Sequence, residues 1–340
     1  MVNDIFCKPH IPSELQPVYR LIETELEEVE NLICKDFSSH DPFVEEVIRY
    51  GLGFAGKRLR PMLLLLSGKV FGPLHLDHLR FAAVLEVIHT ATLLHDDILD
   101  GAKLRRHLET INIRWNNATS ILAGDMMLAQ AMRILTQSEN LFAYRTVTDA
   151  TWKTCEAELR QIGAKRCFTL PKQEYLAIIS GKTATLLSCC CLLGAYFGGA
   201  EESVRRVFAD FGEKIGIAFQ ITDDILDLIG TEQTTGKTLG TDLIEKKLTL
   251  PLLLFLESTE ANNRDAMLQL LSSVEMTPEA IENVAVQLKQ SGAVESASRY
   301  ATELIESAIR SLESLKIENA DKQAVYALID VARFVIQRNQ

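Results

Sequence analysis

The apolar residues of this chain recur at intervals of three and four, the spacing that places side chains on one face of an α-helix. The first such run extends from Leu15 to Ile33 and follows Ser13, whose side chain we expect to cap the helix. Further runs span approximately 42–53, 59–71, 77–101, 118–137, 140–162, 173–197, 201–230, 247–258, 263–273, 278–290, 293–315 and 321–338. No comparable pattern supports strands, so the spacing predicts an all-α protein of about a dozen helices.

Glycine and proline interrupt the runs, for example at Gly51, Gly72-Pro73, Pro171 and Gly198-Gly199. No long Gly/Ser-rich or Pro-rich linker divides the chain. We therefore expect the helices to form a single domain over residues 1–340.

The composition bounds the class of protein. The 340 residues are 47% hydrophobic and 24% charged, which is typical of a globular protein with a large core. The net charge of -11 argues against general binding to nucleic acid, which depends on neutralising phosphates. The seven cysteines include the run Cys189-Cys190-Cys191 and form neither a disulfide framework nor a CxxC pattern. This cysteine usage predicts a reduced, cytoplasmic location.

Targeting segments are not evident. The first residues contain several acids and no apolar leader, and the longest apolar stretch, Thr183 to Gly198, is shorter than a membrane span of roughly 18 apolar residues. We expect a soluble protein.

The sequence Asp-Asp-Ile-Leu-Asp occurs twice, at residues 96–100 and 223–227. Residues three and four apart share a helix face, so the carboxylates of each copy converge. They are Asp96, Asp97 and Asp100 in the first cluster and Asp223, Asp224 and Asp227 in the second. Apolar residues precede both copies, where carboxylates without a counter-charge would be costly. The pattern predicts cation binding at each cluster.

A single cluster of this kind is more often a solvated, acid-rich helix end, but two copies in the same apolar setting favour a metal site. Carboxylate oxygens select hard cations. Magnesium accepts few protein ligands, because it keeps bound waters and takes other ligands from substrate phosphates. We therefore interpret the clusters as magnesium sites of the DDxxD type.

Basic residues provide a second set of candidate ligands. They lie in Gly56-Lys57-Arg58-Leu59-Arg60-Pro61 and, after the first acidic cluster, at Lys103, Arg105 and Arg106. Arginine forms paired hydrogen bonds to phosphate, and Gly56 allows a backbone N–H to approach it closely. Alone, such a segment is more often a solvated turn. Beside magnesium-type carboxylates in an acidic protein, it indicates a diphosphate substrate.

These motifs together resemble the trans-isoprenyl diphosphate synthase (polyprenyl synthetase) family, and within it the long-chain bacterial octaprenyl, heptaprenyl and solanesyl diphosphate synthases. The resemblance spans most of the chain and keeps order and spacing. It also includes Glu86 to Ala91, Leu122 to Asp125, Gly181 to Ala184, Phe219 to Asp224, Gly236-Lys237 and Lys247 to Pro251. It implies one large helical bundle around a central active-site cavity, the isoprenoid synthase fold, and a homodimer.

The resemblance also implies roles for individual residues. Asp96 and Asp100 would hold magnesium ions on an allylic diphosphate with Asp97 in support, and Asp223 would hold a further ion with Asp224 and Asp227 nearby, giving three ions with substrate bound. Arg105, Lys182 and Lys237 would contact the allylic diphosphate. Lys57, Arg60, His89 and Arg106 would bind isopentenyl diphosphate. Thr183, Gln220 and Lys247 match further positions that line the cavity. Without the resemblance, His89 would be interpreted as a hydrogen-bonded core histidine.

The implied reaction begins when the diphosphate leaves the allylic substrate, because metal ions and fixed cations stabilise its developing charge. The isopentenyl double bond then attacks the allylic cation, and a proton is lost. Such an enzyme is a prenyltransferase of isoprenoid biosynthesis. Its product is apolar, so peripheral membrane contact during product release is a further expectation.

Small residues before the first acidic cluster bear on product length. Ala91 and Thr92 lie one turn below Asp96 on the same helix, where a bulky aromatic residue would block a growing chain. Ile88 lies one turn deeper, and Ser188 to Cys191 are also small. The pattern predicts a hexaprenyl to nonaprenyl product. The alternative is that these residues only allow close helix packing.

Three positions depart from the family pattern: Ala55 and Lys246 stand where glycine is common, and His107 follows the paired arginines. They leave the geometry of the substrate loops open. Three other functions remain as alternatives. They are a synthase of the shorter geranylgeranyl or farnesyl diphosphate, a class I terpene cyclase, and a non-catalytic subunit of a two-component synthase.

Overall fold

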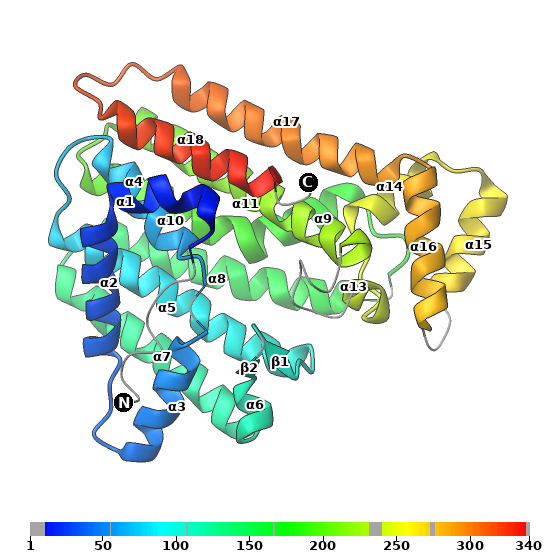
Figure 1. Ribbon diagram of the computed structural model, residues 1–340, viewed down its shortest axis with the longest axis horizontal. Coiled ribbons are helices and arrows are strands. Elements are labelled where there is room, and N and C mark those ends of the chain that lie inside the picture. Colours follow the sequence, from blue (N-terminus) through cyan, green and yellow to red (C-terminus); the bar gives the residue numbers. More distant parts are fainter. Residues whose placement is uncertain are drawn as a thin grey trace. The chain divides into compact units, whose positions relative to one another are not determined.

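The computed structural model describes residues 11–54, 56–106, 108–165, 167–230, 240–272 and 276–337. Regular structure in these ranges is almost entirely helical (Figure 1), so the predicted all-α class is confirmed. The elements up to residue 135 are η1 (Ser13–Leu15), α1 (Gln16–Leu21), α2 (Glu23–Asp36), α3 (Pro42–Leu52), α4 (Leu59–Lys69), α5 (Leu76–Leu99), β1 (Leu104–Arg105), β2 (Leu108–Glu109), α6 (Ile111–Arg114) and α7 (Asn117–Leu135).

The remaining elements follow in chain order. They are η2 (Thr136–Ser138), α8 (Leu141–Ala164), α9 (Lys172–Ile179), η3 (Ser180–Ala184), α10 (Thr185–Phe197), α11 (Glu202–Ile229), α13 (Thr241–Ile244), α14 (Leu250–Ser258), α15 (Ala261–Ser272), α16 (Pro278–Gln290), α17 (Ala293–Glu313) and α18 (Lys322–Gln337). The long helices coincide with the predicted runs to within a few residues. The short helices α6 and α13 and the two strands were not predicted.

The predicted first helix is divided in the structure, and its expected cap is wrong. Helix α1 ends at Leu21 and α2 begins at Glu23, because Ile22 between them has φ -133° and ψ 24°, outside the helical region. The Ser13 hydroxyl donates to the carboxylate of Glu14 at 3.0 Å and does not cap a helix. Apolar spacing continues smoothly through this break, which is why the sequence pattern did not reveal it.

The structure divides into two compact units. Unit 1 comprises Met1–Thr151, Leu186–Gly212 and Ser314–Val331, and unit 2 comprises Trp152–Thr185, Glu213–Glu313 and Ala332–Gln340. Helices α8, α11 and α18 each contribute residues to both units. The single domain expected over residues 1–340 stays a prediction.

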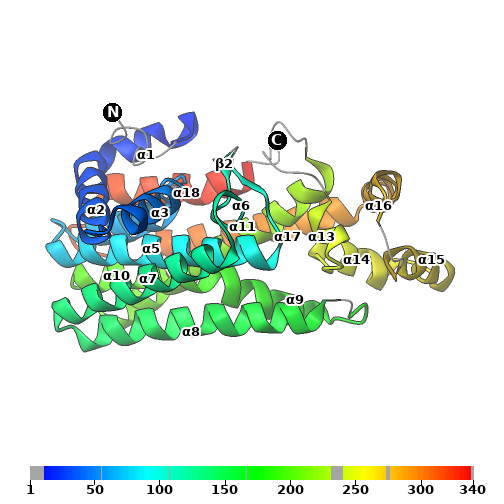
Figure 2. The same ribbon diagram turned by 90° about the horizontal axis from the view of Figure 1, so that it is seen from below.

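Unit 1 is built around α5, which packs against α2, α4 and α7 (Figures 1 and 2). From Phe81 to Ile88 the helix is apolar on nearly every side, with Glu86 as the exception, and all of these residues are buried. A helix that is apolar all round belongs inside a protein. The first acidic cluster is therefore carried by the end of a buried helix.

In unit 2, α17 packs against α14 and α16 (Figure 1). Ala297, Ala301, Ile305 and Ala308 recur on one face of α17 and are buried. This face fixes α17 against the core of the unit. Helix α14, with the apolar run Leu250 to Phe255, lies directly after the Lys247 segment.

One helix within the described ranges has the length and composition of a membrane span. It runs without interruption over Lys172–Phe197, through α9, η3 and α10, and 56% of its most apolar window is buried. It is longer than the apolar stretch Thr183 to Gly198 marked in the sequence. A buried core helix has the same properties, so this is weak evidence for a membrane span.

Candidate active site

The first acidic cluster lies where α5 ends. Asp97 is buried, Asp96 is half-buried and Asp100 caps the helix. Gly101 then has φ +61°, and Ala102 N–H donates to the Asp97 carbonyl at 2.8 Å. This is a Schellman ending, in which glycine takes the left-handed conformation at little cost. The chain turns sharply there.

Arg105 holds the central carboxylate of this cluster. It lies in β1, which pairs with β2 in an antiparallel hairpin that begins just after the turn. Its guanidinium donates to Asp97 three times, from Nε at 3.0 and 3.1 Å and from Nη2 at 2.7 Å. Asp97 is only 1% exposed, so this pair neutralises a buried charge. The Asp97 carboxylate is thus paired with an arginine of the same chain.

Arg106, which follows the first acidic cluster, lies against Gly56 of the basic segment 56–61. Arg106 donates from Nη1 to the Phe54 carbonyl at 2.7 Å. A Cβ at Gly56 would lie 2.2 Å from Arg106 Nη2, so a larger residue there would displace the guanidinium. The predicted isopentenyl-binding residues Gly56 and Arg106 therefore lie together. Lys57 and Arg60 belong to the same segment, and both are half-buried.

Arg58, to which the sequence assigned no role, anchors this segment. It has φ +52° and is 3% exposed. Its guanidinium binds both oxygens of Glu30 on α2, with Nη2 to Oε2 at 2.6 Å, and Nη1 donates to Glu86 Oε1 on α5 at 3.0 Å. The segment that carries Lys57 and Arg60 is thus tied to two helices.

His89 lies one turn after Glu86 on α5. Burial lowers the pKa of His89 well below 6.5, and the neighbouring charges of Arg60, Arg105, Arg106 and Arg58 lower it further. A neutral imidazole is the consequence. His89 can therefore offer one hydrogen bond to a phosphate without adding charge.

The second acidic cluster lies near the end of α11. Asp224 is 5% exposed and accepts from the Tyr175 hydroxyl at 2.7 Å and from Gln220 Nε2 at 2.9 Å. Thr183 donates to Gln220 Oε1 at 2.7 Å. The predicted residues Thr183, Gln220 and Asp224 therefore form one hydrogen-bonded chain. Asp223, their neighbour, is half-buried.

Asp227 performs a structural task that the sequence did not indicate. Its carboxylate accepts from the N–H groups of Thr241 at 3.2 Å and Asp242 at 3.0 Å, at the start of α13. A carboxylate at a helix N-terminus satisfies N–H groups that lack helical partners. Asp227 thus fixes the start of the segment that carries Asp242 and Lys247.

Asp242 is a carboxylate that the sequence analysis missed. Burial and then the charge of Asp227 raise the pKa of Asp242 to about 7. Burial and then Asp242 raise the pKa of Asp224 well above its usual value. Both pKa shifts indicate buried carboxylates that lie close to one another with too little positive charge nearby. A bound cation would relieve them.

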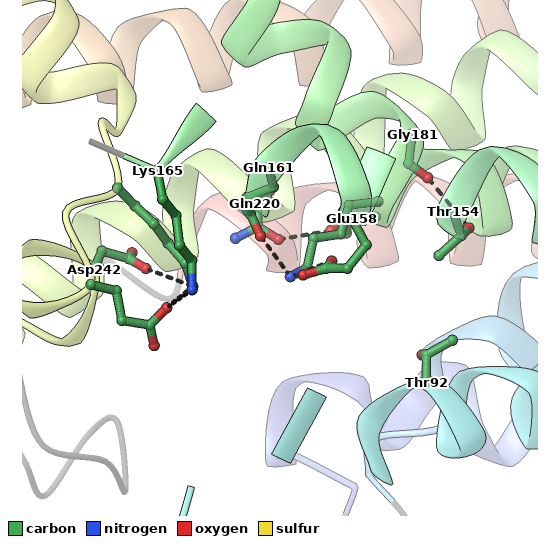
Figure 3. Close-up of polar contacts among 12 residues, drawn as sticks. Thr92, Thr154, Glu158, Gln161, Lys165, Gly181, Gln220 and Asp242 are labelled. Carbon is green, nitrogen blue, oxygen red and sulfur yellow. Dashed lines mark hydrogen bonds and ion pairs between the residues drawn. The ribbon is translucent and has the colours of Figure 1, made fainter. Parts of the chain in front are cut away.

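Lys182 and Lys247 line one pocket in unit 2, together with Gln220, Asp224 and Asp242. Figure 3 shows the polar contacts around it. Lys182 binds Glu158 at 2.7 Å and Gln161 at 2.9 Å. Lys182 lies in η3, a π turn inside the long helix, and such turns are frequent at functional sites.

The residues fit a magnesium site through their donor chemistry, since the acidic clusters offer hard oxygen ligands. Among the described residues, no three His, Cys, Asp or Glu side chains gather closely enough to hold a metal ion by themselves. Magnesium does not need such a cage, because waters and substrate phosphates complete its shell. Asp97, Asp224 and Asp227 accept hydrogen bonds from protein groups. Asp96, Asp100 and Asp223 stay the direct ligands that the sequence predicts.

The chain-length residues all lie in α5. Ala91 and Ile88 are fully buried, and Thr92 is half-buried with its hydroxyl on the His89 carbonyl at 2.8 Å. Cys189, Cys190 and Cys191 of α10 are buried as well.

Five further positions that were singled out in the sequence have different outcomes. Lys237 and Gly236, as well as Ala55 and His107, lie outside the described residues. Lys246 has φ +60°, the conformation that glycine adopts most easily, which explains why glycine suits this position.

Several residues of the site were missed for identifiable reasons. Tyr175 and Asp242 are isolated polar residues, and nothing in a single sequence brings them to α11. Glu158 and Gln161 on α8 and Lys165 just after its end are spaced by three and four, so a polar face was visible. Such a face usually meets solvent.

Comparisons with known proteins show the family of the chain. The sequence profile of the family described as polyprenyl synthetase matches residues 41–288. The heptaprenyl diphosphate synthase component 2 of Bacillus subtilis is 34% identical over 298 residues, which cover 87% of this chain and 84% of that protein. The all-trans-nonaprenyl-diphosphate synthase (geranyl-diphosphate specific) of Rhodobacter capsulatus is 33% identical over 320 residues, covering 91% and 96%.

Solved structures give the same result. A decaprenyl diphosphate synthase from Rhodobacter capsulatus has a TM-score of 0.89 and 31% identity, covering 96% of this chain and 99% of that chain. A polyprenyl synthase from Caulobacter crescentus, complexed with calcium and isoprenyl diphosphate, has a TM-score of 0.86 and 29% identity, covering 96% and 98%.

The helical fold is thus that of the all-α isoprenyl diphosphate synthases. The chain belongs to the polyprenyl synthetase family and is a prenyltransferase. The family expected from the sequence motifs is confirmed.

Proposed function

We propose that this enzyme condenses isopentenyl diphosphate with an allylic prenyl diphosphate to give an all-trans product in the hexaprenyl to nonaprenyl range. The observation that carries the chain length is the small, fully buried Ala91 one turn before Asp96 on α5. Relatives with long-chain names support this proposal, although geranylgeranyl diphosphate synthases of archaea match as well, at 30–33% identity.

In this proposal Lys57, Arg60, His89 and Arg106 bind isopentenyl diphosphate, with Gly56 making room for Arg106. Arg105, Lys182, Lys237 and Lys247 bind or line the allylic diphosphate site. Asp96, Asp100 and Asp223 bind magnesium, supported by Asp97, Asp224 and Asp227. Three magnesium ions would neutralise the leaving diphosphate and so assist its departure. The calcium ion bound to the Caulobacter crescentus enzyme supports a divalent metal here.

The protein groups perform three tasks. The lysines and arginines hold both diphosphates at fixed positions, which converts a bimolecular encounter into an oriented one. The apolar residues around the reacting carbons exclude water, which would otherwise capture the allylic cation. After carbon–carbon bond formation, a proton leaves the new chain, and we propose that the released diphosphate accepts it.

Ala91→Phe tests the chain-length proposal. Phenylalanine one turn below Asp96 should shorten the main product without abolishing turnover, as measured by mass analysis of the prenyl alcohols. Ala82→Phe is a matched control, because Ala82 is equally buried but nine residues away, on the opposite side of α5. If either variant does not fold, Ala91→Leu and Ala82→Leu make the same comparison. An unchanged product from the Ala91 variant would contradict the proposal.

A two-component synthase is the second candidate that an observation favours. The Bacillus subtilis relative is named a component, which suggests a partner subunit for that protein. Elongation by this purified chain alone would exclude a required partner. A terpene cyclase is less well supported, since its product would be a cyclic hydrocarbon and the second DDILD cluster matches the synthases.

We further propose that the enzyme is a cytoplasmic homodimer that contacts membranes only peripherally when product leaves. Two exposed apolar faces support a second copy as the partner. In unit 1, Ile121, Leu122 and Met126 of α7 are 44%, 62% and 46% exposed. In unit 2, Trp152, Cys155, Leu159 and Ile162 of α8 form an exposed stripe at intervals of three and four. Such faces on long helices are typical of oligomer interfaces.

A further inference from the structure

Helix α8 carries a polar row to which neither the motifs nor the comparisons assign a role. Thr154, Glu158 and Gln161 of α8 and Lys165, which directly follows its last residue, are spaced by four, three and four residues, so they share one face. The apolar stripe of Trp152, Cys155, Leu159 and Ile162 occupies another face. Figure 3 shows the polar contacts of the row, and Gln161 and Lys165 line the pocket of unit 2.

Thr154, the first residue of the row, contacts the π turn that carries Lys182. The Thr154 hydroxyl donates to the Gly181 carbonyl at 3.4 Å. A Cβ at Gly181 would lie 2.5 Å from that of Ala157, so the backbones approach as closely as side chains permit. The π turn therefore rests directly on α8, one turn from Glu158.

The next two residues hold the Lys182 ammonium itself. Glu158 Oε2 lies 2.7 Å from Nζ, and Gln161 Oε1 accepts from it at 2.9 Å. The side chains of Lys182 and Glu158 are 20% and 19% exposed, so the ion pair is largely shielded from water. An ammonium has three N–H donors. Two are directed at α8, and the third is the one with which Lys182 can bind a phosphate in the pocket that it lines.

The last residue of the row acts on Lys247 through Glu245. Lys165 Nζ donates to Glu245 Oε2 at 3.0 Å, and Lys247 Nζ lies 2.8 Å from the same oxygen. One carboxylate therefore orients two ammonium groups. The Lys247 ammonium is also 3.8 Å from Asp242.

We propose that the polar row of α8 positions the allylic-diphosphate lysines: Glu158 and Gln161 orient Lys182, and Lys165 orients Lys247 through Glu245. The inference rests on the proposed function, in which both lysines serve the allylic diphosphate. A long lysine side chain loses rotamer freedom when it binds phosphate, and a lysine already held in place loses less. Glu158, Gln161 and Lys165 are thus positioning residues.

A competing effect of Glu158 is distinguishable by experiment: its negative charge would compete with the diphosphate for Lys182. The Glu158→Gln variant distinguishes a positioning carboxylate from a competing one. A positioning carboxylate predicts a Michaelis constant for the allylic diphosphate about threefold higher in this variant, because the amide keeps the hydrogen bond and loses the charge. A competing carboxylate predicts a lower constant than that of the wild type.

The test compares the wild type with Glu158→Ala, Glu158→Gln and Lys165→Met in steady-state elongation with magnesium. We expect the Michaelis constant for the allylic diphosphate to rise about tenfold in Glu158→Ala and about threefold in Lys165→Met, while that for isopentenyl diphosphate changes less than twofold. A variant that merely unfolds in part loses turnover number and leaves both Michaelis constants unchanged. Binding of inorganic diphosphate with magnesium, measured by calorimetry, should weaken in the same order.

Glu174→Gln is the matched control. Glu174 of α9 binds Arg160 of α8 at 2.8 Å, so it too joins these two helices, but the pair is 39% and 42% exposed and does not line the pocket. Both Michaelis constants should stay within twofold of the wild type. The inference is overturned if Glu158→Ala behaves like this control, or if Glu158→Gln binds diphosphate more tightly. A wild type that does not elongate overturns the proposed function instead.

Discussion

At the scale of single residues, the backbone turns beside the two acidic clusters decide which partners the side chains contact. The carboxylates and cations of the two clusters follow from residue type and spacing. That Arg105 binds Asp97, or that Asp227 caps α13, depends on backbone turns at Gly101 and Gly240, which no periodic pattern encodes. The partners therefore had to come from the structure.

His78 allows a prediction about pH. The His78 side chain is fully buried. Its Nδ1 accepts from the His75 N–H at 3.0 Å, so its Nε2 carries the hydrogen. Nε2 donates to the Gly194 carbonyl at 3.3 Å. This arrangement satisfies the neutral ring, and burial lowers the pKa of His78 to about 4. The unfolded chain takes up a proton near pH 6.5. Between these values the unfolded state binds more protons, so stability falls as pH falls.

The contribution of neutral His78 to the free energy of unfolding is complete above pH 6.5, and about 3 kcal/mol of it is lost by pH 4. Urea unfolding of the wild type and of His78→Gln at pH 7.5 and pH 5 measures it. The variant should be less stable at pH 7.5 and should lose less stability on acidification. An equal loss in both proteins would contradict the assignment of a neutral, buried His78.

At the scale of elements, apolar periodicity predicted the long helices because each buries a continuous face. It could not predict β1 and β2, since two residues per strand are too few for an alternating pattern. It also missed α13, a four-residue helix fixed by Asp227 and followed by Lys246 in the left-handed conformation. Short elements of this kind are determined by tertiary contacts.

Arg58 joins α2 and α5 to the basic segment, and its removal should be severe. Arg58→Met leaves Glu30 and Glu86 buried without their counter-charge, which should cost about 3–5 kcal/mol of the free energy of unfolding. Arg310→Met removes an arginine from a pair with Glu306 that is 68% and 58% exposed, and should cost less than about 1 kcal/mol. Urea denaturation compares them. A similar, small loss in both variants would show that the buried ion pairs do not anchor the segment.

At the scale of the whole molecule, no interface could be predicted from the sequence, because an apolar helix face that meets a partner copy has the same pattern as one that meets the core. The exposed stripe of α8 becomes visible only once burial is known. Trp152→Glu with Leu159→Glu should convert a dimer into monomers in sedimentation experiments, because charge is costly in an apolar interface. Tyr326→Glu, on α18 and 64% exposed, is the control and should leave the dimer intact. A wild type that sediments as a monomer would contradict the proposed homodimer.

The most direct test of the central claim is the mass of the product made by the purified chain alone. With magnesium, isopentenyl diphosphate and farnesyl or geranylgeranyl diphosphate, we predict linear prenyl diphosphates in the hexaprenyl to nonaprenyl range. Removal of magnesium by a chelator should stop the reaction. A product that ends at geranylgeranyl diphosphate, a cyclic hydrocarbon, or no elongation without a second protein would contradict the account.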